Sequence, residues 1–409
     1  MLLFAIEFLK AHYGIKLPAV FSYTSTRMIL AAITSLVICI FLGPRFIKKL
    51  YELKIGQSIR TDECPHLGIL HQKKKDTPTM GGILILFSMV VSLVLWMNLT
   101  HIFSLILLIT TIFLGFVGGW DDYLKLKYKN PKGLASRKKF FYQLLISSLL
   151  PLYLLSPALT SHVPFKRWFD PPVVKEQTQI KENAEGKTTS TLTQISLKEY
   201  ATRLYIPFLK DPVLSFSGIF TAFAFLFMVF VITGASNAVN LTDGLDGLAA
   251  GCLILVAGCL ALIAFVSNNV DLARYLNILY IEGSGEIGIY LSALAGACLG
   301  FLWYNSYPAQ VFMGDTGSLP LGGILGVCAI LLKKEMLLGI IGGIFVAETV
   351  SVILQVGSCK LRNKKRIFLC TPLHHHFEFK GWPETKVVIR FWIVGLLLAI
   401  VGIASLKFQ

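Results

Sequence analysis

Carboxylate and amide side chains gather at the ends of apolar blocks in this sequence. Asp121 and Asp122 are adjacent, and Lys125 follows Asp121 at the four-residue spacing that puts two side chains on one face of a helix. Neighbouring carboxylates repel each other, so one of them keeps its proton to a higher pH unless a cation lies between the two. The pair is a candidate for acid–base chemistry or cation binding; a solvated helix end is the alternative explanation.

A second polar group follows residue 236. Asn240, Asp243 and Asp246 recur at every third residue, which on a helix places their side chains on one face. Gly244 and Gly247 follow the two aspartates and permit close approach of the backbone to a ligand. An ordinary turn is also rich in Asn, Asp and Gly, but the repeated Asp-Gly pair favours a binding cluster.

A third carboxylate stands alone. Asp315 is the only charged residue between Glu286 and Lys333, and it lies between Gly314 and Thr316. A carboxylate in this setting suits a hard cation such as Mg²⁺ together with phosphate oxygens. The alternative is a helix N-cap, for which aspartate is a preferred residue.

Three consecutive histidines, His374, His375 and His376, lie in a basic stretch near the C-terminus. Adjacent side chains of one element point in different directions, so the three cannot readily bind one metal ion. We therefore expect contacts with phosphate or diphosphate rather than transition-metal ligation. Acidic groups in several loops, surrounded by basic residues, describe a Mg²⁺–diphosphate site, and phosphoryl transfer needs little beyond positioning, a metal and a base.

These groups must be positioned by a very apolar chain. Of its 409 residues, 55% are hydrophobic and 15% are charged, and the mean hydropathy is +0.67. Soluble domains carry about 25% charged residues, so an ordinary soluble protein, a disordered chain and a coiled coil are all excluded. The net charge of +15 is explained by membrane orientation and an anionic substrate, and we expect no nucleic-acid partner.

The sequence predicts an all-α polytopic membrane protein, because a bilayer span needs about 20 apolar residues and barrel strands would alternate in polarity. We predict about ten transmembrane helices, at residues 24–44, 81–100, 102–120, 140–158, 216–235, 248–267, 286–304, 317–332, 336–357 and 389–406.

Lysine and arginine predict the orientation of these spans. They concentrate in the loops 45–80, 121–139 and 358–388, and such loops face the cytoplasm. Both termini are then periplasmic, and the active site lies at the cytoplasmic face of a single transmembrane transferase domain, residues 1–409. Residues 159–215 are expected to form an extended polar periplasmic loop without a chemical role. Glu348 lies inside the ninth span, where a carboxylate is a functional candidate, and its role is open.

Six motifs carry a resemblance that covers nearly the whole chain except residues 159–215. The sequence resembles the polyprenyl-phosphate N-acetylhexosamine-1-phosphate transferases, and within them the phospho-N-acetylmuramoyl-pentapeptide transferase branch, which the histidine motif marks most specifically. The motifs are TPTMGG at 77–82, DDYLK at 121–125, NAVNLTDGLDGL at 237–248, WYN at 303–305, FMGDTGSL at 312–319 and PLHHHFEFKGW at 372–382.

The resemblance implies a multi-pass enzyme of the bacterial inner membrane that acts in peptidoglycan synthesis. UDP-N-acetylmuramoyl-pentapeptide and undecaprenyl phosphate would give lipid I and UMP, with Mg²⁺ as cofactor. It implies Asp315 as the metal ligand, Asp121 as the base on the lipid phosphate, and Asp122 as its support. The catalytic set is then Asp121, Asp122, Asp315 and His374, and the substrate-binding set is Lys74, Lys125, Asn240, Asp243, Asp246, Asn305, Phe312, His375 and His376, with Phe312 placed to stack on uracil.

Two other functions compete with this interpretation. A sister enzyme using UDP-N-acetylglucosamine would share the aspartates. A secondary transporter would place charged groups near the middle of the bilayer, whereas here all but Glu348 lie at the boundary. The sequence leaves open a homodimer and a covalent intermediate; we favour one-step transfer, because a lipid phosphate is already anionic near neutral pH.

Overall fold

The structure is a computed structural model of the chain. It describes residue 12, residues 18–53, residue 74, and residues 77–128, 133–156, 172–180, 189–363 and 365–407. Parts of two basic loops, at 54–73, 75–76 and 129–132, lie outside the described residues. So do residues 157–171 and 181–188, which include much of the predicted periplasmic loop.

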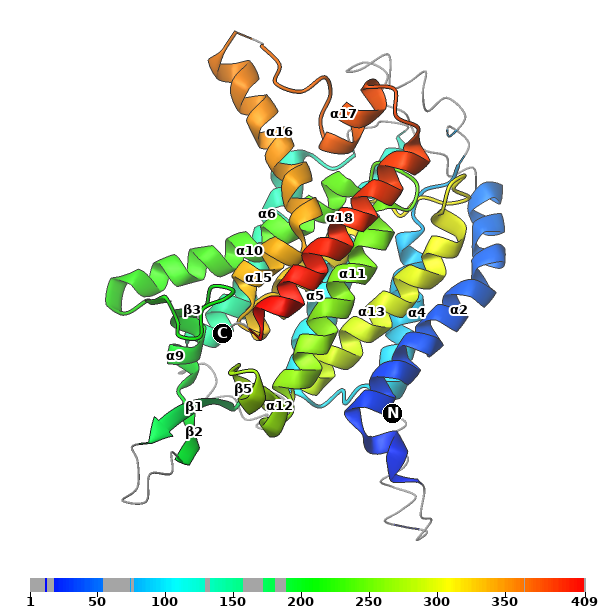
Figure 1. The fold of residues 1–409 in the computed structure, drawn as a ribbon. Helices are drawn as coiled ribbons and strands as arrows, with labels where there is room; N and C mark the ends of the chain where they lie inside the picture. Colours follow the sequence, from blue (N-terminus) through cyan, green and yellow to red (C-terminus); the bar gives the residue numbers. More distant parts are fainter. Residues whose placement is uncertain are drawn as a thin grey trace.

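Apolar helices dominate the described part of the chain, which confirms a polytopic helical membrane protein (Figure 1). Seven helices are long and apolar enough to cross a bilayer, and α4 and α14 are shorter apolar helices. The main helices are α2 (Thr24–Glu52), α4 (Gly82–Trp96), α5 (Ile102–Lys127), α6 (Ser136–Leu155), α10 (Thr221–Thr242), α11 (Leu248–Ser267), α13 (Ser284–Asn305), α14 (Asp315–Leu331), α16 (Gly343–Leu361) and α18 (Glu384–Ser405). Shorter helices are η1 (Ala19–Ser22), α9 (Leu197–Thr202), η3 (Gly218–Phe220), α12 (Val270–Tyr275), α15 (Glu335–Ile341) and α17 (Leu373–Phe379).

One predicted span is broken. Residues 336–357 were expected to form a single helix, but the chain turns between α15 and α16 at Gly342 and Gly343. Two adjacent glycines are a common cause of a sharp kink, because they add no side chain that would hold the helix together. Glu348 therefore lies in the second turn of α16 rather than in the middle of a continuous span.

The all-α prediction is wrong for the segment around residues 174–215. Strands β1 (Val174–Ile180) and β2 (Thr189–Ile195) pair antiparallel, and β1 also pairs with β5 (Tyr280–Ile281), giving the order β2-β1-β5. A two-residue pair, β3 (Arg203–Leu204) with β4 (Leu214–Ser215), follows. Strand β2 is rich in threonine, and β1 contains Val174, Thr178 and Ile180. These residues have β propensity, a signal that the polar composition obscured.

Part of this polar segment is also fastened to the helices. Tyr200 is 1% exposed, and its hydroxyl donates to the carbonyl of Leu331 at the end of α14. Arg203 makes an ion pair with Glu176 at 2.6 Å. The segment is therefore not simply an extended loop in its described part.

Glycines let the central helices approach each other closely. A Cβ atom at Gly296 of α13 would lie 2.1 Å from the carbonyl oxygen of Ala32 in α2, and one at Gly322 of α14 would lie 2.4 Å from that of Ala235 in α10. A second glycine follows each of them four residues later: Gly300 also faces α2, and Gly326 also faces α10. Such small-xxx-small pairs are a usual basis of helix association in membranes.

The first long helix begins, and the last one ends, at the same end of the bundle (Figure 1). The beginning of α2 and the end of α18 lie on the side of α12 and the small sheet, whereas α17 lies at the opposite end (Figure 1).

A buried ion pair joins α2 to α13. The Nη2 atom of Arg27 lies 2.7 Å from Glu286 Oε1, with both side chains about nine-tenths buried. Arg27 Nε donates to the Trp96 carbonyl, and the Asn98 N–H donates to Glu286, so the pair also holds the end of α4.

We expect Arg27→Met to lower the free energy of unfolding by about 3–5 kcal/mol, because Glu286 would be left as an unpaired buried charge. The double variant Arg27→Met/Glu286→Gln should recover much of that loss. Thermal melting in detergent checks both, and equal melting of wild type and the single variant would contradict the assignment.

Candidate active site

Three carboxylates from two helices meet at one point. Asp121 and Asp122 lie near the C-terminal end of α5, and Asp315 is the first residue of α14; one oxygen of each lies within 4.8 Å of the others. Gly118 makes the meeting sterically feasible, since a Cβ there would lie 2.1 Å from the carbonyl oxygen of Asp315. Helix α5 can therefore touch the start of α14 directly.

Two lysines neutralise this aspartate cluster, which we define as Asp121, Asp122 and Asp315. The Nζ atom of Lys125 lies 2.6 Å from Asp121 Oδ2 and 2.6 Å from Asp315 Oδ2, and 3.4 Å from Asp122 Oδ1. Lys139, in the first turns of α6, adds contacts of 2.7 Å to Asp315 and 3.7 Å to Asp121. The structure thus places a cation between the adjacent carboxylates.

Hydrogen bonds fix each carboxylate separately. Asp122 Oδ2 accepts from both the backbone N–H and the hydroxyl of Thr316, at 2.9 and 2.7 Å. Asp121 Oδ1 accepts from the Leu134 N–H at 2.7 Å. Asn240 donates to Asp315 Oδ1 at 2.5 Å and to Ser318 Oγ at 2.8 Å, so α10 is connected to the same centre.

The charges of the cluster suit a divalent cation. With all three carboxylates ionised, the two lysine ammonium groups leave one negative charge in a site where the Asp121 and Asp122 side chains are 2% and 3% exposed. All donors are hard oxygens, the ligands that Mg²⁺ prefers. The sequence named only Asp315 as metal ligand; the geometry adds Asp121 and Asp122 as candidates.

The second polar group lies beside the aspartate cluster. Asp243 caps the end of α10 and accepts a hydrogen bond from the backbone of Gly314, next to Asp315. Burial, together with the nearby carboxylates of Asp315 and Asp122, raises the pKa of Asp243 to about 7. The pKa of Asp243 thus depends on the charge of the aspartate cluster, although Asp243 is not a member of it.

Lys74 connects three distant segments next to this group. Its Nζ lies 2.6 Å from Asp246 Oδ1 and 2.6 Å from Glu384 Oε1, and 5.9 Å from the centre of the Phe312 ring. Glu384 Oε1 also accepts from the Asp246 N–H at 2.8 Å. Phe312 remains partly exposed, so one face of this group is accessible to a ligand.

The three histidines of α17 have three different surroundings. His374 is fully buried, with Nδ1 3.1 Å from Glu348 Oε2 and its backbone N–H 3.2 Å from Glu348 Oε1. His375 Nδ1 lies 2.7 Å from Glu378, and His376 Nδ1 accepts from the Leu369 N–H at 3.2 Å. The three side chains thus have different partners, although the ring centres of His374 and His375 are 4.2 Å apart.

Burial changes the interpretation of His374 and Asn305. His374 packs against Gly244, where a Cβ would lie 2.3 Å from Nε2, so it supports the loop that holds Asp243. Asn305 is 3% exposed; it accepts from the Gly247 N–H at 3.0 Å and donates to the Val311 carbonyl at 2.8 Å. Both residues join backbone segments around the site.

Sequence reasoning missed four residues that the structure brings to the site: Lys139, Thr316, Ser318 and Glu384. Thr316 and Ser318 could have been found, because they lie within one turn of Asp315. Lys139 lies in the first turn of α6 and Glu384 is the first residue of α18, and no local spacing connects them to the aspartates.

Direct metal binding tests the cluster. We expect Asp315→Asn to weaken Mn²⁺ binding at least about tenfold, the effect of losing about 1.4 kcal/mol of interaction with the cation. Titration followed by the electron paramagnetic resonance signal of free Mn²⁺ measures this, and Asp271→Asn, at the other end of the molecule, is the matched control. Unchanged affinity in Asp315→Asn would show that the carboxylate is only the first residue of a helix.

Comparison with known proteins agrees with this geometry. Residues 104–333 match the model of glycosyl transferase family 4, and residues 74–86 match signature 1 of phospho-N-acetylmuramoyl-pentapeptide-transferase. The phospho-N-acetylmuramoyl-pentapeptide-transferase of Protochlamydia amoebophila is 68% identical over 410 residues, which cover 100% of both chains. That of Thermodesulfovibrio yellowstonii is 44% identical over 390 residues, 95% of each chain. The chain therefore belongs to glycosyl transferase family 4, and within it to the phospho-N-acetylmuramoyl-pentapeptide-transferases.

Proposed function

We propose that the chain transfers phospho-N-acetylmuramoyl-pentapeptide from its UDP derivative to undecaprenyl phosphate, forming lipid I and UMP in the first membrane step of peptidoglycan synthesis. The observation that carries the proposal is the aspartate cluster with Lys125 and Lys139, built from the ends of three helices. The full-length identity to relatives of that name supports the choice of substrates.

Asp121, Asp122 and Asp315 would hold Mg²⁺, which when bound would offset the negative charge that develops on the diphosphate of the UDP-sugar. The ammonium groups of Lys125 and Lys139 would lie within reach of the diphosphate oxygens. When the substrate binds, they would leave the carboxylates and contact its phosphates. The backbone and hydroxyl of Thr316 keep Asp122 in place during that exchange.

In the proposed reaction an oxygen of the lipid phosphate attacks the phosphorus attached to the sugar. The bond from that phosphorus to the bridging oxygen breaks, and UMP leaves with the oxygen. Asp121 would accept the remaining proton of a lipid monoanion on Oδ2, since its Oδ1 is bound by Leu134. We favour this direct route because the attacking phosphate is already anionic.

The part of the site that binds the nucleotide would consist of Lys74, Asp243, Asp246 and Phe312. The ring of Phe312 is available to stack on uracil. His375 and His376 are partly exposed on α17 and would contact phosphates. His374 packs against Gly244, and Asn305 accepts a hydrogen bond from Gly247; both glycines lie in the loop after α10. These contacts support roles in positioning that loop rather than direct contact with the substrate.

The proposed setting is the bacterial inner membrane, with ten spans in one domain of residues 1–409, periplasmic termini and the aspartate cluster at the cytoplasmic face. The positive-inside rule supports this orientation. It also agrees with the position of the start of α2 and the end of α18 opposite α17 (Figure 1).

UMP release by detergent-solubilised protein with undecaprenyl phosphate and Mg²⁺ tests the function. We expect turnover with UDP-N-acetylmuramoyl-pentapeptide and none above background with UDP-N-acetylglucosamine. Asp315→Asn should lower turnover at least about 10²-fold, the scale of losing one strong electrostatic contact in the transition state, and its residual rate should need more Mg²⁺.

Asp271→Asn is the control and should keep the wild-type rate. Equal turnover with both UDP-sugars would identify the sister activity instead, and wild-type kinetics in Asp315→Asn would remove the aspartate cluster from the mechanism.

A further inference from the structure

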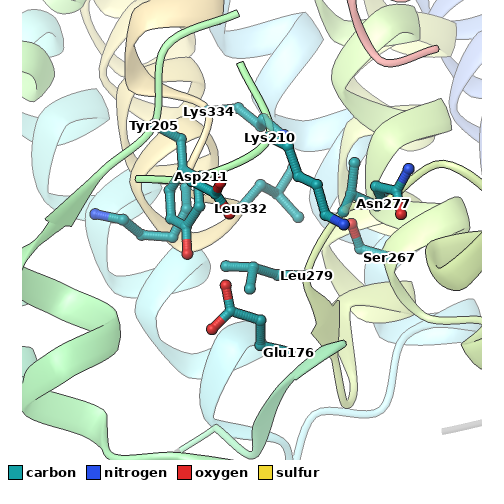
Figure 2. A pocket seen from close by; sticks show the side chains of 11 residues that line it. Glu176, Tyr205, Lys210, Asp211, Ser267, Asn277, Leu279, Leu332 and Lys334 are labelled. Carbon is teal, nitrogen blue, oxygen red and sulfur yellow. The ribbon is translucent and has the colours of Figure 1, made fainter. Parts of the chain in front are cut away.

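A polar cavity lies at the end of α14 that is opposite Asp315 (Figure 2). It contains about 550 Å³ of space outside the protein atoms, part of it open to solvent. The 17 residues of α14 separate the two places by about 25 Å at 1.5 Å per residue. The cavity is therefore distinct from the active site.

Segments far apart in the sequence build this cavity. Glu176 comes from β1, Tyr205 and Lys210 from the segment around β3 and β4, Asn277 from the turn before β5, and Lys334 from the turn between α14 and α15. Figure 2 shows Tyr205 and Glu176 on one side of the space and Ser267 and Asn277 on the other. The polar segment that the sequence left without a role thus supplies one wall.

Ion pairs account for part of the charge in the cavity. Glu176 pairs with Arg203 at 2.6 Å, and Lys333 pairs with Glu335 at 2.8 Å. Lys334 is only 9% exposed, and within the described residues no hydrogen bond or ion pair reaches its amino group. Two lysines thus share one glutamate: Lys333 makes the close ion pair, and Lys334 has only the more distant charge of Glu335.

A buried ammonium group without a close ion pair is costly. Burial lowers the pKa of Lys334 to about 8, although Glu335 opposes that change, so the amine is still largely protonated at neutral pH. An anion in the cavity would supply the missing charge.

Other side chains could help to bind such an anion. Lys210 lines the cavity at its half-buried edge, and Ser267 and Asn277 offer a hydroxyl and an amide that make no side-chain hydrogen bond within the described part of the chain. Two carboxylates also line the cavity, but Glu176 is paired with Arg203. Asp211 is exposed to solvent, which screens its charge.

We propose that this cavity binds a phosphate group, with Lys334 as the buried counter-charge and Lys210, Ser267 and Asn277 as further donors. Lysine binds phosphate as a point charge, and hydroxyl and amide donors can complete the contacts to its oxygens. The phosphate belongs either to an anionic lipid headgroup at the membrane surface or to a soluble phosphate compound.

Thermal melting of the purified full-length protein tests the site. Sodium phosphate, compared with sodium chloride at equal ionic strength, should raise the melting temperature of wild type, because a ligand that binds only the native state stabilises it. Lys334→Met should lose at least half of the rise. Lys198→Met, which removes an exposed lysine of α9, should keep the whole rise, and UMP release should stay within about twofold of wild type in both variants.

Lys210→Met, at the edge of the cavity, serves as the second variant if Lys334→Met does not fold, and it should also reduce the rise. Melting in nanodiscs distinguishes the two sources. If wild type melts at a higher temperature in phosphatidylglycerol than in phosphatidylcholine, and these variants lose that difference, the phosphate belongs to a lipid. A wild-type response in both lysine variants, in phosphate and in nanodiscs, would overturn the proposal without affecting the proposed transferase function.

Discussion

Mutual repulsion among three carboxylates is the constraint on which the rest of the site depends. Asp121, Asp122 and Asp315 lie close enough to share one ligand, and their concentration at one point requires compensating positive charge. Lys125 and Lys139 provide it in the structure described here, from the same helix as two of the aspartates and from the next one. The two lysines leave one negative charge of the three ionised carboxylates uncompensated. The same geometry therefore also favours a divalent cation.

Close helix packing makes that concentration of charge feasible. Gly118 lets α5 reach the first residue of α14, and Gly322 and Gly326 set α14 against α10, which carries Asn240. Around this centre, buried polar side chains join loops rather than face the ligand. The Glu348–His374 pair holds α17 against the loop of Asp243, and Asn305 connects that loop to the segment before Asp315. The kink at Gly342 and Gly343 puts Glu348 within reach of α17.

The sequence was sufficient for the features that depend on local spacing and composition. Apolar blocks predicted helices, and the four-residue step from Asp121 to Lys125 predicted the ion pair that the structure contains. Contacts between distant segments could not be derived in that way: Lys139 and Glu384 reach the site only because helix packing brings the starts of α6 and α18 there. The burial of His374 was also beyond local reasoning, since its partner Glu348 is 26 residues earlier. The hairpin of β1 and β2 was missed because polar composition was taken to indicate an extended loop.

In the proposed mechanism, lysine and a metal cation compete for the same carboxylates. The most direct test is the rise in melting temperature that Mg²⁺ produces in Lys139→Met, compared with wild type and with Lys138→Met, which alters an exposed neighbour without a contact to the cluster in the described residues. Removal of the Lys139 charge leaves the three carboxylates with one lysine, so Mg²⁺ should bind more tightly and stabilise Lys139→Met more than the other two proteins. An equal or smaller rise in Lys139→Met would show that the cation, if it binds, does so elsewhere.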